Sequence, residues 1–218
     1  MSIQALIGTP ERKQQLVRCA SIGAGVLVII LGIFFGWRMY VSYREESAHA
    51  AFAQQLDLYN QAKAGKNTWA NVEMAFKVAH SQHSGSYLAP YFLAFQADAL
   101  VQQQKTTEAL MVMNTMLDAL PHSSPFYGLY AGKRALIKLD SNEQTVQQEG
   151  LQELTALAQD VHNVHNDMAQ FYLASYNWSK NNVDQARQLW QSLADANKQA
   201  AIASPWATMA ADKLEQIA

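Results

Sequence analysis

Residues 90–121 read PYFLAFQADALVQQQKTTEALMVMNTMLDALP, and this stretch decides the fold class. Apolar residues recur at spacings of three and four on both sides of a polar QQQKT segment, which is the period of one face of an α-helix. A proline stands at each end of the stretch, where the start or the end of a helix tolerates it. The stretch therefore predicts two α-helices joined by a short turn.

The chain after Tyr43 has the same character throughout. β-Branched residues are sparse, and the Asn-Gly and Asp-Gly pairs typical of β-hairpins are absent. We therefore predict an all-α body. Further helices are expected at residues 51–62, 69–79, 125–139, 151–158, 168–178, 183–193 and 205–217.

Helix pairs that return every 30–40 residues are typical of solenoids, and the 34-residue tetratricopeptide spacing is the natural comparison. If Ala109 takes the small position of a second helix, Ala97 falls on the small position of the first helix and Met113 on a large apolar position. If Ala186 takes the same small position, Trp190 falls on the large apolar one. Small residues let two helices cross closely, so both alignments favour a tetratricopeptide-like solenoid of helical hairpins.

The middle of the chain fits this spacing less well. Ala131 and Gly150 are the candidate small positions, but the polar connection at 140–148 then makes the repeat about seven residues too long. About three helix pairs are enough for a continuous core, and residues 205–217 are expected to form a helix that caps the open end. A non-repetitive helical bundle is the alternative.

Residues 19–37 read CASIGAGVLVIILGIFFGW and contain no charge. As a helix they would span roughly 28 Å, close to the ~30 Å hydrocarbon core of a bilayer. Arg18 and Arg38 flank the segment, and aromatic residues follow at its exit, where headgroups favour them. We predict a transmembrane anchor over 19–40. A signal peptide cleaved after Ala48-His49-Ala50 is the alternative, but the stretch that precedes it is long and charged.

Three basic residues precede the apolar segment and two follow it closely, which favours a cytoplasmic N-terminus. The expected organisation is a cytoplasmic tail over 1–18, the anchor, and an exported repeat domain over 41–218. Gly32 and Gly36 form a G-x-x-x-G step within the anchor, which is a candidate site of helix packing in the membrane. Ordinary tolerance of glycine in membrane helices is the alternative.

The sequence shows no motif of a reaction centre. Glycine-rich phosphate loops, nucleophile elbows and H-E-x-x-H are absent. One cysteine excludes a disulfide framework within the chain, and a net charge of −2 excludes the basic character of most nucleic-acid-binding proteins. His80 with His83, and His162 with His165, have the spacing of paired metal ligands, but no third ligand accompanies either pair. We therefore expect no enzyme activity, no cofactor and no metal.

A solenoid of helix pairs has a concave face lined by the first helix of each pair, and such faces bind peptides or partner helices. Phe171 and Trp178 are seven residues apart, so they share a helix face and could anchor a protein ligand. Aromatic residues at this spacing can equally be core residues, and this alternative stays open. The alignments above place five residues on the groove side: Tyr91, Asp98, Val101, Phe171 and Trp178.

The layout resembles a known family over nearly the whole chain. The anchor ends in GWRMY at 36–40 and runs into SAHAAFAQQL at 47–56, and the chain closes on SPWATMAADKLEQI at 204–217. Together with the degenerate tetratricopeptide pairs, these segments resemble the YfgM-like family, ancillary subunits of the bacterial SecYEG translocon.

The resemblance implies a single-pass protein of the bacterial inner membrane with a periplasmic repeat domain. It further implies association with translocon subunits and with periplasmic chaperones such as PpiD, to assist newly exported proteins, and it implies no catalytic residues. The alternative is a cell-envelope scaffold that self-associates, for example through Gly32 and Gly36, without a role in secretion.

Overall fold

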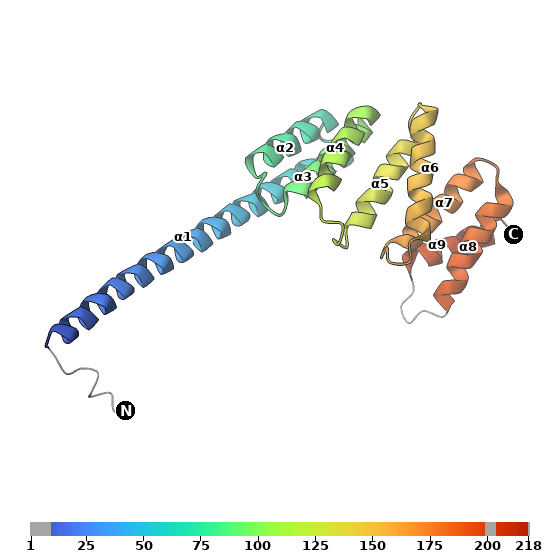
Figure 1. Ribbon diagram of the computed structural model, residues 1–218. Coiled ribbons are helices and arrows are strands. Elements are labelled where there is room, and N and C mark those ends of the chain that lie inside the picture. The colour runs from blue at the N-terminus through green and yellow to red at the C-terminus, as the bar shows by residue number, and fades with distance from the viewer. Residues whose placement is uncertain (1–9, 199–203, 218) are drawn as a thin grey trace, which may run out of the picture. The chain divides into compact units, whose positions relative to one another are not determined.

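The computed structural model of the chain describes residues 10–198 and 204–217, and within them every regular element is an α-helix (Figure 1). This confirms the predicted all-α class. The chain divides into two compact units, Met1–Ala50 and Ala51–Ala218, and the first helix belongs to both. The helices are α1 (Pro10–Lys63), α2 (Trp69–Gln82), α3 (Ala89–Gln102), α4 (Thr106–Ala119), α5 (Tyr127–Leu139), α6 (Gln144–Gln159), α7 (Asn166–Ser179), α8 (Val183–Lys198) and α9 (Pro205–Gln216).

The first unit is the N-terminal part of α1. From Gly23 onward this helix is long and apolar enough to cross a membrane, and its apolar window is not buried by the protein. Its large apolar side chains between residues 26 and 43 are 36 to 77% exposed. A Cβ added at Gly32 or Gly36 would meet nothing within 4 Å. Residues 1–9 of the predicted tail lie outside the described residues.

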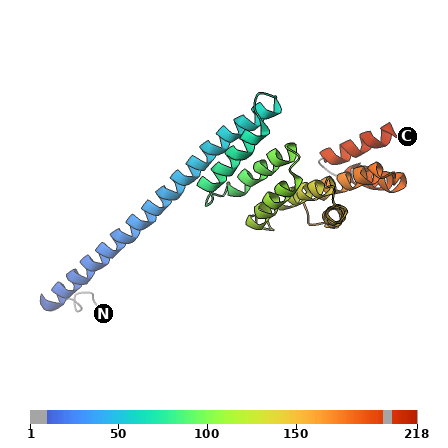
Figure 2. The ribbon, with the colours of Figure 1, turned by 90° about the horizontal axis from the view of Figure 1, so that it is seen from above.

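The second unit is built from helix pairs. The end of α1, from Ala51 onward, packs with α2 and α3 around Val72 and Phe76. After it, α3 pairs with α4, α5 with α6, and α7 with α8, while α9 packs on α8 and α7 (Figure 2). The described residues therefore contain four pairs, and the end of α1 supplies the first helix of the first pair, in agreement with the helices expected at 51–62 and 69–79. The predicted cap at 205–217 is confirmed as α9.

The residues on which both alignments rest are buried. Ala97, Ala109 and Met113 are 0% exposed and belong to one hydrophobic cluster between α3, α4 and α5. Ala186 is 0% exposed and Trp190 is 1% exposed, and both belong to a second cluster between α7, α8 and α9. Small residues therefore lie where paired helices cross, as predicted.

The repeat is longer than the predicted 34 residues. The second helices α2, α4, α6 and α8 begin at residues 69, 106, 144 and 183, so successive repeats are 37 to 39 residues long. The additional length lies in the loops between pairs, 83–88, 120–126 and 160–165, which we call the inter-pair loops. The predicted insertion at 140–148 is wrong: the turn is only 140–143, and α6 begins at Gln144.

The assignment of Ala131 to the small position of the middle pair is also wrong. A Cβ added at Gly150 would lie 2.7 Å from the Cβ of Lys138 and 2.8 Å from the carbonyl oxygen of Ala135. Lys138 precedes Gly150 by twelve residues, the same separation as between Ala97 and Ala109. A lysine therefore occupies the small position, and Ala131 instead packs against the α3–α4 cluster. Lys138 lies seven positions after Ala131. Taking Ala131 as the small position therefore makes the repeat come out about seven residues too long.

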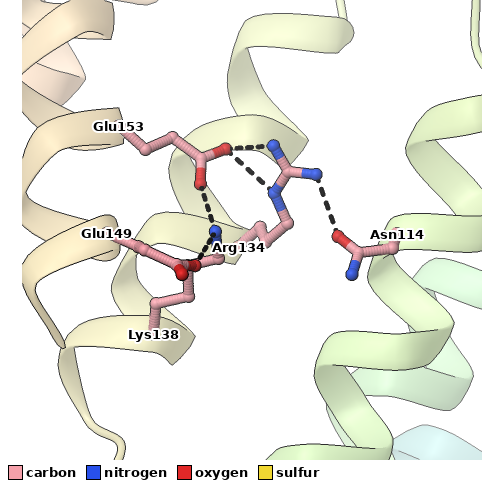
Figure 3. Close-up of polar contacts among 5 residues, drawn as sticks. All are labelled: Asn114, Arg134, Lys138, Glu149 and Glu153. Atoms are coloured by element: carbon pink, nitrogen blue, oxygen red, sulfur yellow. Dashed lines mark hydrogen bonds and ion pairs between the residues drawn. The ribbon is translucent and has the colours of Figure 1, made fainter. Parts of the chain in front are cut away.

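Lys138 belongs to an ion-pair network between α5 and α6 (Figure 3). Its ammonium lies 3.4 Å from Glu153 and 3.2 Å from Glu149. Arg134 donates from Nε to Glu153 at 2.9 Å and from Nη1 to Asn114 of α4 at 2.9 Å. Two cations thus meet two carboxylates, Glu149 and Glu153, which follow the polar start of α6 on the same helix.

The inter-pair loops share one turn. The side-chain oxygens of Ser86, Ser124 and Asn163 each accept a hydrogen bond from the backbone N–H two residues later, at 3.1, 3.3 and 3.1 Å. These residues are 38 and 39 positions apart, so the turn recurs with the repeat. Such turns hold a loop in one conformation just before the next helix begins.

We expect Glu153→Gln to lower the free energy of unfolding by about 1–3 kcal/mol, because Arg134 and Lys138 then keep partly buried charges without their shared carboxylate. Glu149→Gln is the matched control, since this side chain is 62% exposed and the Glu153 side chain only 15%. The control should change stability by less than about 0.5 kcal/mol. Urea unfolding followed by circular dichroism measures both, and equal effects would contradict the role of the network.

We expect Gly150→Ala to destabilise the protein by about 1–2 kcal/mol, because the overlap with the backbone of α5 outweighs the gain of about 1 kcal/mol in helix propensity. Gly132→Ala is the control. Its Cβ would meet only the terminal methyl of Met168, which can move aside. Thermal unfolding should show a lower midpoint for the first variant and an unchanged or higher one for the second; the reverse order would refute the close crossing.

Candidate protein-binding surfaces

The first candidate surface lies between the first helices α3 and α5. Tyr91 of α3 places its ring centroid 5.9 Å from that of Phe126 and 6.2 Å from that of Tyr130. Asp98, two turns further along α3, forms an ion pair with Lys133 of α5. The structure thus brings two of the predicted groove residues together on one surface with residues of the next repeat.

This surface continues to the first pair. The rings of Tyr59 on α1 and Phe95 on α3 approach edge to face, with centroids 5.1 Å apart. Burial raises the pKa of Tyr59, and the negative charge of Asp98 raises it further. Burial, Tyr91 and Asp98, in that order, raise the pKa of Tyr130 to about 12. Both phenols therefore stay neutral near pH 7 and keep a hydroxyl that can donate a hydrogen bond to a ligand.

We call Tyr59, Tyr91, Phe95, Asp98, Tyr130 and Lys133 the aromatic face. All six are half-buried, and they present flat apolar rings, neutral hydroxyls and one internally compensated ion pair. Amphipathic aromatic residues of this kind dominate protein-binding surfaces, because they bury much area at a small entropic cost. Sequence reasoning found Tyr91 and Asp98 but missed the others, since the 34-residue spacing assigned them no common face.

Val101 and Phe171 do not form part of a free groove. Val101 is partly buried and packs against the α3–α4 cluster. Phe171 is 5% exposed, with its ring centroid 5.6 Å from that of Trp206 on α9 and 6.5 Å from that of Trp190 on α8. For Phe171 the structure therefore favours the core alternative, because α9 covers this part of α7.

Trp178 differs from Phe171 although the two share a helix face. Its side chain is 40% exposed, and its ring centroid lies 5.8 Å from that of buried Trp190. It borders a pocket of about 370 Å³ at the end of the repeat unit, which we call the terminal pocket. The pocket is lined by Ser175, Trp178, Trp190, Lys213, Gln216 and Ile217.

The terminal pocket combines apolar walls with one cation. Lys213 donates to the side chain of Gln216 at 3.3 Å, an uncharged partner. An apolar side chain of a ligand could lie on the indole of Trp178 while an acceptor group contacts the Lys213 ammonium. Sequence reasoning found Trp178 but not Lys213 or Ile217; the SPW start of α9 marked the helix but not how far it extends over α7.

The two H-x-x-H pairs lie in or beside inter-pair loops. The ring of His83 stacks on Phe92 with centroids 6.0 Å apart, and Nε2 of His165 lies 3.0 Å from the carbonyl oxygen of Pro125. Over the described residues, no group of three or more His, Cys, Asp and Glu side chains could hold a metal ion. Burial lowers the pKa of His80, which favours its neutral form.

Among solved structures, the chain is similar to a tetratricopeptide repeat protein from Parabacteroides merdae, with a TM-score of 0.53 and 17% sequence identity. The fold is tetratricopeptide-like. The match covers 79% of this chain and 60% of that protein, so this chain spans less than two thirds of its length. No protein-family model matches the sequence, and no curated protein matches it either.

We expect Tyr130 to make stability pH-dependent at alkaline pH. Its pKa is 10.0 when unperturbed and about 12 in the folded chain, so its stabilising effect is complete below pH 10 and disappears as the pH rises from 10 to 12. Tyr130→Phe should therefore weaken the loss of stability in this range. Urea unfolding midpoints from pH 9 to 12 test this; a pH profile identical to that of the unsubstituted protein would contradict it.

Proposed function

We propose that the chain is a membrane-anchored protein-binding module, ancillary to the SecYEG translocon and linking it to periplasmic chaperones for exported proteins. The observation that carries the binding role is the terminal pocket, where a 40% exposed tryptophan stands beside Lys213 in a tetratricopeptide-like fold. Exposed aromatic anchors next to a concave site are typical of surfaces that bind protein segments. The aromatic face provides a second, broader contact area on the first helices.

Membrane anchoring is supported by the exposure of α1. Its apolar side chains from Val26 to Tyr43 are not covered by the protein, and such a continuous apolar surface is unfavourable in water. A bilayer would cover it, with 19–40 as the span. The excess of basic residues before the span favours a cytoplasmic N-terminus, and residues 41–218 would then be periplasmic.

The link to the translocon rests on the resemblance to the YfgM-like family. GWRMY at 36–40 and SPWATMAADKLEQI at 204–217 carry that resemblance. The second segment contains α9 and the residue that follows it, and Lys213 and Ile217 of this segment line the terminal pocket. The distinctive end of the chain thus contributes to the surface on which the proposed binding depends.

We expect a photo-crosslinking amino acid at position 178 of the full-length protein, in native membranes, to capture translocon subunits or periplasmic chaperones. The reason is that this side chain is exposed at the mouth of the terminal pocket and would be covered by a bound segment. Position 111 on α4 is the control, since Met111 is 59% exposed but lies outside both candidate surfaces. Mass spectrometry of the crosslinked bands identifies the partners.

Capture of the same proteins from both positions would contradict a specific role of the pocket. Capture only of a second copy of the chain would favour the envelope scaffold, and Gly32→Leu should then disrupt the oligomer in mild detergent. Trp178→Ala should reduce capture from a second probe at position 216 by at least tenfold without a change in helical content.

A further inference from the structure

The two edges of the repeat unit differ in chemistry. The turns within pairs, at 64–68, 103–105, 140–143 and 180–182, form one edge, and the inter-pair loops form the other, because paired helices run in opposite directions. The turns carry charges in every repeat: Lys66, Lys105, Asp140, Glu143 and Lys180. The three described inter-pair loops contain a single charged residue, Asp160.

The edge of the inter-pair loops, which we call the loop edge, exposes large apolar side chains instead. Tyr87 is 59% exposed, Phe126 46%, Val161 79% and Val164 70%. The described turns on the opposite edge contain no large apolar residue. One edge of the repeat unit thus exposes apolar side chains, and the opposite edge carries charged side chains.

These side chains are held outward by an ordered backbone. The turns at Ser86, Ser124 and Asn163 fix the loops, and Nε2 of His165 contacts the carbonyl oxygen of Pro125 in the neighbouring loop at 3.0 Å. The loops at 120–126 and 160–165 lie along the lower edge of the unit in Figure 1. A preformed row of apolar side chains binds an apolar surface without an additional cost of ordering.

The position of this edge in the chain indicates its partner. The chain enters the repeat unit at Ala51 and reaches the first turn at 64–68, so Ala51 lies at the loop edge. Ten residues, 41–50, separate Ala51 from the end of the predicted span. These ten residues belong to helix α1 and are about 15 Å long as a helix. Ala51 therefore lies at most about 15 Å from the hydrocarbon boundary.

We propose that the loop edge binds the interfacial layer of the lipid bilayer in which α1 is anchored. The inference rests on the proposed membrane anchoring. A Tyr side chain favours the interfacial layer, where its ring can lie among acyl chains while its hydroxyl stays hydrated. The Phe ring gains from the same burial among acyl chains. Valine side chains gain from the same environment, and the near absence of charge from the loops removes the cost of desolvating ions.

The experiment uses the full-length protein, with Cys19→Ser, reconstituted into vesicles of phosphatidylcholine and phosphatidylglycerol that contain a lipid spin-labelled at the headgroup. A fluorophore is attached to a single cysteine, Val164→Cys on the loop edge or Asn142→Cys on the opposite edge. Both positions are exposed, so labelling itself should leave the fold intact. Tyr43→Cys at the end of the apolar segment reports anchoring.

We expect quenching at position 164 to be at least twofold stronger than at position 142, with strong quenching at position 43. The double variant Val161→Ser with Phe126→Ser should reduce the quenching at 164 by at least half. Strong quenching at 43 with equal, weak quenching at 164 and 142 would overturn the lipid-binding edge and leave the anchoring intact. Weak quenching at 43 would overturn the anchoring and this inference with it.

Discussion

Close crossing of paired helices is the constraint on which the repeat unit depends. Three of the four crossings have a small residue on at least one helix: Ala97 with Ala109, Ala174 with Ala186, and Gly150 against Lys138. Where both residues are alanine, the large neighbours Met113 and Trp190 complete the packing. Where the first residue is a lysine, the second must be glycine, and the lysine needs carboxylates within reach. The ion-pair network of α5 and α6 thus follows from the presence of a lysine, Lys138, at the crossing of these helices.

Much of the fold could be predicted from the sequence. Helical periodicity, prolines at helix starts and the pairs of small residues gave the all-α class, two of the crossings and the capping helix. The middle repeat could not be predicted in this way, because Lys138 does not look like a crossing residue and the polar start of α6 looks like a loop. The repeat length was missed because the inter-pair loops add a few residues to each repeat. Ser86, Ser124 and Asn163 carry that longer period in the sequence.

The candidate surfaces were predicted less completely. Periodicity places Phe171 and Trp178 on one face of α7, but it does not tell which part of that face another helix covers. Trp206 of α9 covers Phe171, and the helix end at Ile217 leaves Trp178 open. In the same way, the aromatic face depends on Tyr59 of α1 and Tyr130 of α5, which come from the repeats before and after the one that contains α3. Contacts between repeats depend on how the helix pairs pack on one another. The residue pattern within one repeat does not predict them.

The stacking order has a consequence for how the chain acquires its structure. The main contacts join helices that are at most two elements apart, such as α2 with α3 and α7 with α9. Low sequence separation between contacting residues favours fast folding with little loop-closure entropy. Each pair can therefore fold on the preceding one while the chain is still being synthesised, N-terminus first. The hydrophobic cluster around Phe171 includes residues of α9 and is completed only when α9 packs. The last pair is therefore the part of the protein that completes its folding last.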